Sequence, residues 1–454
     1  MKGKKVWLSA VFAAAILWLI PAQVLAGETV WEGKAKISGR VTIPPGEVLV
    51  VKAGTEVEVV PSKDSELFVQ GKLIVEGTRE KPVRFSPGKE GGPPLWKGIT
   101  LVGSKESVVS FCVVEGALKG FSLVDSSLKV SHSTFRENRV AFEVNQKSRL
   151  EVEGSVFEGN YAGIVVSLSG EALVQNATFR SIRDTGIVVQ NGGRGKVVDC
   201  TFSEGKKGLF ALTNAPLVVE GSRFSSLDVG VVLRQAGKTT EVTRCSFENN
   251  QTGILTVQFT ACQISDCVIR KNRVGLDARE FSSPHVTHCE FTSNETAVNL
   301  FRKSNSLIDF NVFLNNRTAI MIDYSSYPGI FNNNFERNDM HIRLGKFQSG
   351  DWEAREGSRR ISRREAMRRG SRNMAAFDVK VDYPGRVNAR GNFWGTDLGE
   401  PSGEEMNLEK IWDGRDFGPV KYEGYGDREY KIDIVDFSDW KRAPVPDAGV
   451  RKGS

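Results

Sequence analysis

The sequence is poor in the residues that usually hold metal ions. It has four histidines and six methionines among 454 residues, and these do not cluster. Only the stretch SPHVTHCEF, with His285, His288 and Cys289, suggests zinc ligands. No second pair of ligands follows at a matching spacing, so we predict no metal site. The lack of a Met or His cluster also argues against copper.

Long hydrophobic runs are missing after the first 26 residues. The chain begins with the basic region MKGKK, which is followed by the apolar region VWLSAVFAAAILWLI and by PAQVLA, a cleavage site with small residues. The apolar stretch is shorter than the ~20 residues that a membrane-spanning helix needs. We predict a signal peptide at 1–26 with cleavage after Ala26, no transmembrane segment in the mature chain, and a periplasmic or secreted protein. An uncleaved signal anchor is the alternative, and the lack of a Cys after the site argues against a lipoprotein.

What the sequence does contain is a repeat. An apolar anchor returns at intervals of 22 or 23 residues, at Phe135, Phe157, Phe179, Phe202, Phe224, Phe247, Ile269, Phe291, Phe313 and Phe335. A small residue, Gly or Ala, follows the first nine anchors in step. A Val or Ile precedes it by four or five residues, and in one repeat we assign this position to Val198. Similarity at a fixed period predicts a stacked-repeat architecture.

Within each repeat the apolar residues alternate, which indicates strands rather than helices. Val, Ile, Phe and Thr fill short runs that are separated by Gly, Asn and Ser. We predict three short strands per coil, each paired in parallel with the next coil. An Asn recurs at a bend, at Asn138, Asn160, Asn250, Asn272, Asn294, Asn316 and Asn338, where the amides can bond to one another along the stack.

These features resemble the bacterial right-handed parallel β-helix proteins of the pectin-lyase-like superfamily. The opening GRVTIPPGEVLVVKAGTEVEVV, LFVQGKLIVEGTREKPVRFSP and LWKGITL resembles the first coils, and NARGNFWGTDLG with IWDGRDFGPVKYEGY resembles the final coil and exit. The resemblance implies an all-β solenoid but no particular activity. We divide the mature chain into an N-terminal cap with the first coils, regular repeats, an Arg-rich insertion, a final coil and a C-terminal extension, at 27–105, 106–345, 346–376, 377–397 and 398–454.

Five of the six cysteines share one position, two residues before the anchor. They are Cys112, Cys200, Cys245, Cys267 and Cys289, where other repeats have Ser or Ala. We predict buried free thiols that act as small apolar groups. A disulfide between neighbouring coils is the alternative, although parallel side-chain directions suit it poorly. Cys262 lies outside this pattern.

The Arg-rich insertion interrupts the repeat, because the next anchor that we assign after Phe335 is Phe393. The segment WEAREGSRRISRREAMRRGSRN has eight Arg and three Glu, and Ser362 with Glu365 forms a capping box for a short helix. It is either a solvated excursion between two strands of one coil or a contact for an anionic partner. Such a partner would be acidic polysaccharide, lipid A phosphate or an envelope protein rather than nucleic acid. The arginines that we predict as this contact are Arg359, Arg360, Arg363, Arg364, Arg368 and Arg369.

The strand after each small residue carries the candidate sites. Its outward positions are apolar in five successive repeats, at Val165, Val188, Phe210, Val232 and Leu255. We expect this apolar face to be covered by a loop, the C-terminal tail or a second subunit, or else to bind a ligand. Polar residues follow on the same face, and they are the weak catalytic candidates Asp277, Arg279, Asn299, Asp323, Tyr324 and Arg343.

The resemblance implies two ways in which such polar residues could act. β-Helix lyases hold calcium with acidic residues and use a basic side chain to take a proton, and inverting hydrolases use paired carboxylates. The sequence lacks both the clustered Asp set of galacturonases and the Asp-Pro-His of alginate epimerases, so no catalytic residue is carried over. We predict no cofactor, and calcium only if the protein is a lyase.

We predict an exported protein that presents elongated faces for binding polysaccharide or a cell-envelope partner, without established catalysis. One alternative is a polysaccharide lyase, epimerase or hydrolase acting at the polar residues. Another is a periplasmic assembly or maturation factor. The sequence makes no prediction of the oligomeric state.

Overall fold

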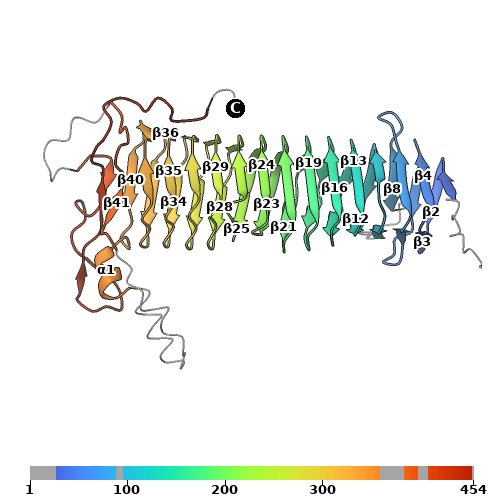
Figure 1. Cartoon of the computed structure of the whole chain (residues 1–454), viewed down its shortest axis with the longest axis horizontal. Coiled ribbons are helices and arrows are strands. Elements are labelled where there is room, and N and C mark those ends of the chain that lie inside the picture. Colours follow the sequence, from blue (N-terminus) through green and yellow to red (C-terminus); the bar gives the residue numbers. More distant parts are fainter. Residues whose placement is uncertain (1–26, 88–95, 358–382, 397–406, 452–454) are drawn as a thin grey trace, which may run out of the picture.

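The computed structural model describes residues 27–87, 96–357, 383–396 and 407–451. They form one elongated parallel β-helix, with the N-terminal coils at one end and the C-terminal extension at the other (Figure 1). A regular coil has three strands, as in β13 (Ser127–Ser131), β14 (Thr134–Arg136) and β15 (Val140–Asn145). Each strand pairs in parallel with its counterpart in the next coil, which confirms the predicted fold class.

The first strands of the coils form a continuous parallel sheet. It contains β1 (Glu28–Trp31), β4 (Val48–Lys52), β7 (Lys72–Glu76), β10 (Ser107–Ser110), β13, β16 (Arg149–Glu153), β19 (Glu171–Gln175), β22 (Arg194–Val198), β24 (Leu217–Glu220), β26 (Thr240–Thr243), β29 (Gln263–Ser265), β32 (His285–Thr287), β35 (Leu307–Asp309), β38 (Gly329–Phe331), β41 (Arg386–Asn388) and β45 (Ile434–Asp436).

The second and third strands form the other two sides of the solenoid. The second strands are β2 (Lys34–Ile37), β5 (Glu56–Val59), β8 (Val83–Pro87), β11 (Cys112–Glu115), β14, β17 (Val156–Glu158), β20 (Thr178–Arg180), β27 (Ser246–Glu248), β30 (Val268–Arg270), β33 (Glu290–Thr292), β36 (Val312–Leu314) and β39 (Asn334–Glu336). The third strands are β3 (Arg40–Ile43), β6 (Glu66–Val69), β9 (Trp96–Val102), β12 (Ala117–Val124), β15, β18 (Ala162–Val166), β21 (Thr185–Gln190), β28 (Thr252–Val257), β31 (Val274–Arg279), β34 (Thr296–Phe301), β37 (Thr318–Asp323), β40 (Met340–Leu344) and β42 (Ile411–Trp412). In two coils the second and third strands merge, as β23 (Thr201–Leu212) and β25 (Arg223–Arg234).

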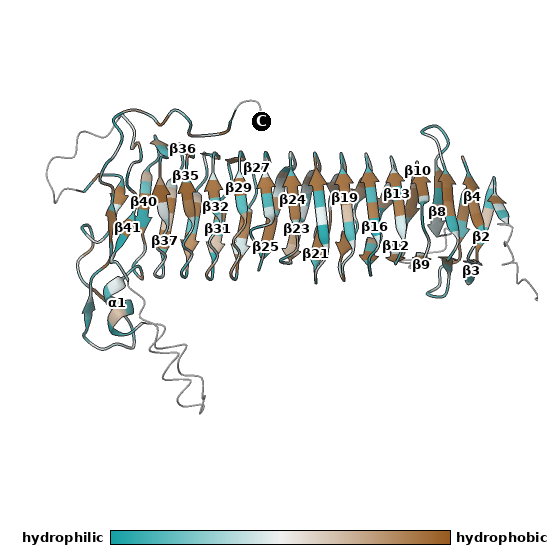
Figure 2. Cartoon of the chain, viewed as in Figure 1, coloured by the Kyte–Doolittle hydropathy of each residue, from teal (hydrophilic) through white to brown (hydrophobic). Residues whose placement is uncertain are grey.

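The anchor residues stack along the interior. All ten are at most 1% exposed, and the rings from Phe157 to Phe247 lie nearly parallel with centroids 4.4–4.9 Å apart. Hydrophobic residues recur along every coil in Figure 2. One assigned position is wrong: Val197, not Val198, pairs with Val174 and is buried, because a 23-residue repeat shifts the strand by one residue.

The asparagine column forms a buried ladder, as predicted. In a typical step, the backbone N–H and the side-chain amide of Asn272 both donate to Oδ1 of Asn294, at 3.0 and 3.1 Å. The same side-chain amide also donates to the carbonyl of Phe247. A second ladder, which the sequence analysis missed, joins Asn311, Asn333 and Asn392. The ladders satisfy polar groups at turns where water is excluded.

All six cysteines are buried and carry free thiols. Burial raises the pKa of Cys200 and of Cys262 to about 12, so both stay protonated at neutral pH. In the Cys245, Cys267 and Cys289 column, each thiol lies 3.2–3.3 Å from the carbonyl oxygen two residues earlier. These thiols therefore fill small inward positions.

The Arg-rich insertion does not lie between two strands of one coil. It leaves after β40 and returns before β41, in the turn that joins two successive coils. The anchor beyond it is Trp394 rather than Phe393, because Trp394 stacks on Phe335 with ring centroids 4.7 Å apart. The capping box of Ser362 and Glu365 and the six predicted arginines lie outside the described residues.

The first part of the insertion is packed rather than solvated. The short helix α1 (Gly350–Arg355) begins at Ser349, whose side chain accepts a hydrogen bond from the backbone of Trp352. Asp433 of the C-terminal extension accepts hydrogen bonds from Gln348 and the backbone of Gly350. A small hairpin of β43 (Val420–Lys421) and β44 (Glu429–Tyr430) lies in the same extension. Among the described residues no helix is long and apolar enough to cross a membrane.

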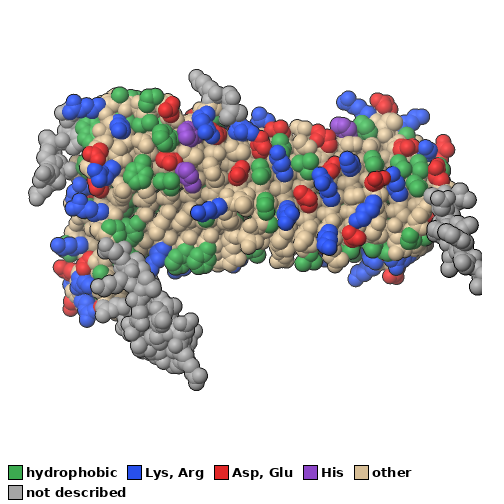
Figure 3. Space-filling view, in the orientation of Figure 1, with side chains coloured by type: hydrophobic (Ala, Val, Ile, Leu, Met, Phe, Trp, Pro, Cys, Tyr) green, Lys and Arg blue, Asp and Glu red, His purple; other side chains and the backbone are tan. Residues whose placement is uncertain are grey.

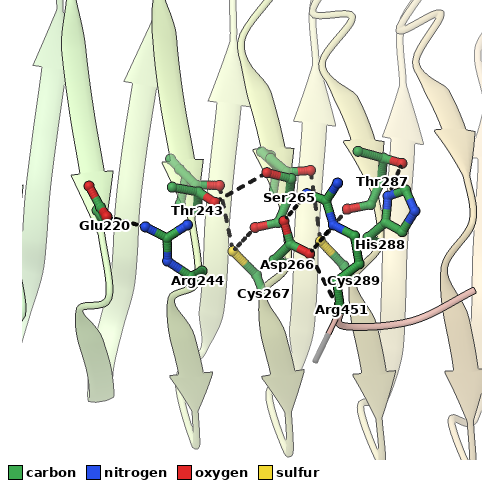
Figure 4. A network of polar contacts seen from close by, with 12 residues as sticks. Glu220, Thr243, Arg244, Ser265, Asp266, Cys267, Thr287, His288, Cys289 and Arg451 are labelled. Carbon is green, nitrogen blue, oxygen red and sulfur yellow. Dashed lines mark hydrogen bonds and ion pairs between the residues drawn. The ribbon is translucent and has the colours of Figure 1, made fainter. Parts of the chain in front are cut away.

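The C-terminal strap, residues 441–451, runs back along the turns between first and second strands. The backbone of Val445 exchanges two hydrogen bonds with the side chain of Asn334, and the N–H of Gly449 donates to the carbonyl of Phe310. At its end Arg451 pairs through two nitrogens with Asp266 (Figure 4). Arg451 lowers the pKa of Asp266, so this contact is favourable at neutral pH.

Candidate functional site

The outward residues of the third strands form one straight row. Strand pairing places Val165, Val188, Phe210, Val232, Leu255, Asp277, Asn299, Met321, Arg343 and Trp412 side by side in that order. In the apolar half, Val232 is 7% exposed and the other four are partly exposed. The C-terminal strap does not cover this half, because it lies along a different edge of the coils.

At the start of the polar half, Asp277 holds Arg279. Asp277 is 2% exposed, and its carboxylate accepts from Nε of Arg279 at 2.9 Å and pairs with a terminal guanidinium nitrogen at 2.6 Å. Asn299 donates a further hydrogen bond of 2.8 Å to the same carboxylate. The Asp277 carboxylate raises the pKa of Arg279, which therefore stays charged.

A pocket of about 510 Å³ lies at the far end of this face. It is lined by Glu295, Thr296, Arg317, Thr318, Met321, Asp323, Arg343, Leu344, Gly345, Lys346 and Phe417. Two of the six predicted polar residues, Asp323 and Arg343, thus come together in it. Asp277, Arg279 and Asn299 lie on earlier coils, and the ring of Tyr324 packs between those of Phe301 and Phe347.

Asp323 is the acidic group with the most unusual surroundings in this pocket. Its Oδ1 accepts hydrogen bonds from the backbone N–H groups of Tyr324 and Phe347, at 2.8 and 3.0 Å. Burial raises the pKa of the carboxyl group above its usual range, and these two hydrogen bonds and the charge of Lys346 oppose that effect. A side chain at Gly345 would collide with this carboxylate, so the backbone there can approach only because the residue is glycine.

The cations around the pocket are available to a ligand. Arg343 and Lys346 are exposed, and neither forms a salt bridge with a residue in the described part of the chain. Arg317 approaches Glu295 only to 3.9 Å, with both side chains more than half exposed. Elsewhere charged side chains of both signs are interspersed, as Figure 3 shows for one face. Pairs such as Lys129 and Glu151 are typical of that solvated surface.

Sequence reasoning missed several residues of this site. Arg317, Lys346 and Glu295 lie in turns, which the strand pattern ignores. Trp412 is 39% exposed beside Arg343, and its ring contacts Phe417 edge to face with centroids 5.8 Å apart. Both aromatics belong to IWDGRDFG, which resembled only a chain exit. The signal that could have found them was the continuation of the outward row into β42.

The side chains of the stretch SPHVTHCEF do not converge on one point. His285 lies 2.9 Å from Asp309, His288 contacts Thr287 and stacks on Phe310, and Cys289 points inward. Within the described residues no group of three His, Cys, Asp or Glu side chains could hold a metal ion. The pocket combines two exposed cations that form no salt bridge with a described residue, the partly buried carboxyl group of Asp323 and the ring of Phe417.

Several solved structures are similar to this chain. The chain is similar to a mannuronan C-5 epimerase A-module from Azotobacter vinelandii, with 10% identity over 66% of this chain and 87% of that chain and a TM-score of 0.42. It is also similar to the periplasmic alginate epimerase AlgG, with 11% identity over 68% of this chain and 74% of that chain and a TM-score of 0.42. The catalytic domain of a GH87 α-1,3-glucanase is similar at 10% identity over 66% of this chain and 64% of that chain, with a TM-score of 0.48.

At such identities the likeness concerns the fold alone. No curated protein matches the chain. The family described as right-handed beta helix region matches residues 84–179, 162–303 and 260–350. Together these matches cover 84–350, more than half of the 454 residues. The chain belongs to the right-handed β-helix family.

Proposed function

We propose that the protein binds an acidic polysaccharide along its third-strand face, with an anionic group of the sugar chain held in the pocket. The observation that carries this proposal is the pair of exposed cations in the pocket, Arg343 and Lys346, neither of which forms a salt bridge with a described residue. Phe417 lines the same pocket, and Trp412 lies beside Arg343 on the next strand. A guanidinium group binds a carboxylate through two parallel hydrogen bonds. Aromatic rings can pack on the apolar faces of sugars.

The shape of the face supports an extended ligand. The outward row continues across the coils from Val165 to Trp412 without a change of direction, because every step is a parallel strand pair. An extended polymer could contact this row at several places, whereas a single small molecule could fill only the pocket. We also propose that the protein works outside the cytoplasm, as a periplasmic or secreted protein, which cell fractionation would test.

Binding is tested by calorimetric titration of the purified protein with oligouronates of defined length, using neutral oligoglucans as a control. We expect Arg343→Ala to lower the affinity about tenfold or more, since a charge-assisted hydrogen bond contributes about 1.5–3 kcal/mol. Binding should weaken as salt rises. Arg139→Ala is the control, an exposed arginine in the turn between β14 and β15 of an early coil. Equal affinity of the Arg343 variant and the wild type would refute the proposal.

The Arg-rich segment remains a separate proposed contact for an anionic partner. Because Trp352 packs edge to face on Tyr422 and Tyr425, a clean deletion has to spare α1 and remove only residues 358–382. If the deletion variant still folds but loses salt-sensitive binding, the contact belongs to the arginines of the segment rather than to the pocket.

A second candidate function is lyase or epimerase chemistry on a uronate. The observation that favours it is Asp323, a carboxyl group whose pKa is raised by burial and which shares the pocket with cations that can hold the carboxylate of the sugar. Incubation with polyuronate, followed by ultraviolet absorbance for unsaturated products and NMR for epimers, tests this candidate. Activity that Asp323→Asn removes without loss of binding would replace the pure binding function.

A further inference from the structure

Asp277 is an acidic residue at a position where the fold accepts apolar side chains. In the five preceding coils the same outward position holds Val165, Val188, Phe210, Val232 and Leu255. Asp277 is 2% exposed there, so its carboxylate has lost most of its water. A buried ion pair contributes little to stability compared with apolar packing. The stability of the fold therefore does not explain why Asp277 follows Leu255 in this row.

The effect of Asp277 is to fix Arg279. Both carboxylate oxygens lie 2.9 Å from Nε of Arg279, and the Asn299 amide holds one of them from the other side. The side chain of Arg279 is nevertheless 49% exposed. The arrangement presents a rigid guanidinium group with free N–H donors toward solvent. Arg234, two coils earlier in the same row, is exposed too, but only the neutral side chain of Gln258 holds it.

Arg279 lies on a coil that precedes the pocket, on the third-strand face along which an extended ligand would lie. Strand pairing leads from β31 through β34 and β37 to β40, so Arg279 and Arg343 are separated by three strand spacings, about 14 Å along the axis. Phe301 and Asp323 are the residues that follow Arg279 in its own row. The path between the two arginines thus runs over a partly exposed aromatic ring.

We propose that Arg279 is a second anion-binding subsite, and that the ligand is a polyanionic sugar chain whose charged groups repeat along its length. Asp277 is the positioning residue of this subsite. The inference rests on the proposed function, because the pocket is taken as the first subsite. It adds that a ligand too short to reach both arginines binds only through the pocket.

The experiment is a length series of oligouronates, from the monosaccharide upward, titrated into wild-type protein, Arg279→Ala and Arg234→Ala. In the wild type, affinity should rise when the oligomer becomes long enough to reach both arginines. Arg279→Ala should lower the affinity for those longer oligomers about tenfold and leave the monosaccharide unchanged. Arg234→Ala is the control. With the shortest oligomers that reach both Arg279 and Arg343, its affinity should equal that of the wild type.

Two further variants separate positioning from charge. Arg279→Lys keeps the charge but cannot form the paired contact with Asp277, and Asp277→Asn keeps the shape but removes the ion pair. Both should reduce the rise of affinity with length, although both keep the positive charge at residue 279. A merely structural role would change the affinity for the monosaccharide as well.

The outcomes are distinct. If Arg343→Ala abolishes binding while Arg279→Ala changes nothing at any length, the proposed function stands and the second subsite is wrong. Equal losses for short and long oligomers in Arg279→Ala would also overturn the subsite, since they would report a distorted pocket. If wild-type protein binds no oligouronate of any length, both proposals fail.

Discussion

The interior of the solenoid and its third-strand outer face belong to the same coils, yet the interior stays uniform along the axis while the outer face changes. The inward anchor is Phe or Ile at all ten positions, and each is buried. The outward row changes from Leu255 to Asp277 in one step and ends at Arg343 and Trp412. The interior is uniform because each coil stacks on a near copy of itself. The outer face is free of that constraint and can carry a site.

The largest effect is expected in the interior. Phe247→Ala should destabilise the protein by about 3–5 kcal/mol, because it removes a fully buried ring and leaves a cavity. Its ring stacks on Phe224, so the damage should spread to that coil. Chemical denaturation measures the loss. Phe259→Ala, an aromatic that is 68% exposed on the outside, is the control and should change stability by about 0.5 kcal/mol or less. Similar losses of stability in the two variants would show that the anchor position is no more important for stability than an exposed position.

The polar part of the interior should respond less strongly. Asn294→Ala removes the oxygen that accepts from two N–H groups of Asn272 and the amide that donates to the carbonyl of Ile269. Each buried group left without a partner costs about 1–3 kcal/mol, partly relieved if water enters. We expect hydrogen exchange of the Asn272 amide to accelerate in this variant. An unchanged exchange rate and midpoint of unfolding would show that the ladder adds nothing to stability.

The smallest effect is expected on the outer face, at Asp323, and its sign depends on pH. Because burial raises the pKa of Asp323, the folded protein holds this proton more tightly than the unfolded chain. Its contribution to stability is therefore present in acid and is lost as pH rises from about 4 through the raised pKa of the folded state. Asp323→Asn keeps an oxygen for the backbone donors and cannot ionise.

We therefore expect Asp323→Asn to flatten this part of the stability profile and to be neutral or stabilising, within about 1 kcal/mol, at pH 7. Thermal unfolding across pH measures it, and Asp125→Asn, at an exposed turn of an early coil, is the control. A variant that is less stable at pH 7 than at pH 4, relative to the wild type, would mean that the charged form is favoured in the fold and that the site is not strained by burial.

The sequence was most informative where one constraint repeats. The anchors from Phe135 to Phe335 could be aligned because the period is constant, and the same alignment identified the outward row. It failed where the chain length between coils changes. Val198 was assigned in place of Val197, and Phe393 in place of Trp394, because a one-residue difference reverses the side of a strand on which a residue lies. Only strand pairing and ring stacking resolve such a difference.

By itself, the sequence determined the parallel β-helix, the three-strand coil, the asparagine ladder and the inward cysteines, because each of these follows from a local pattern that returns at every coil. Only the tertiary structure decided that Asp323 and Arg343 share a pocket with Lys346 and Phe417, while Asp277 instead binds Arg279. It also placed the C-terminal extension against the last coils. The physical reason is that a repeat sets which residues lie side by side on neighbouring strands, whereas turns and chain ends have no period, and their positions depend on packing between segments far apart in the sequence.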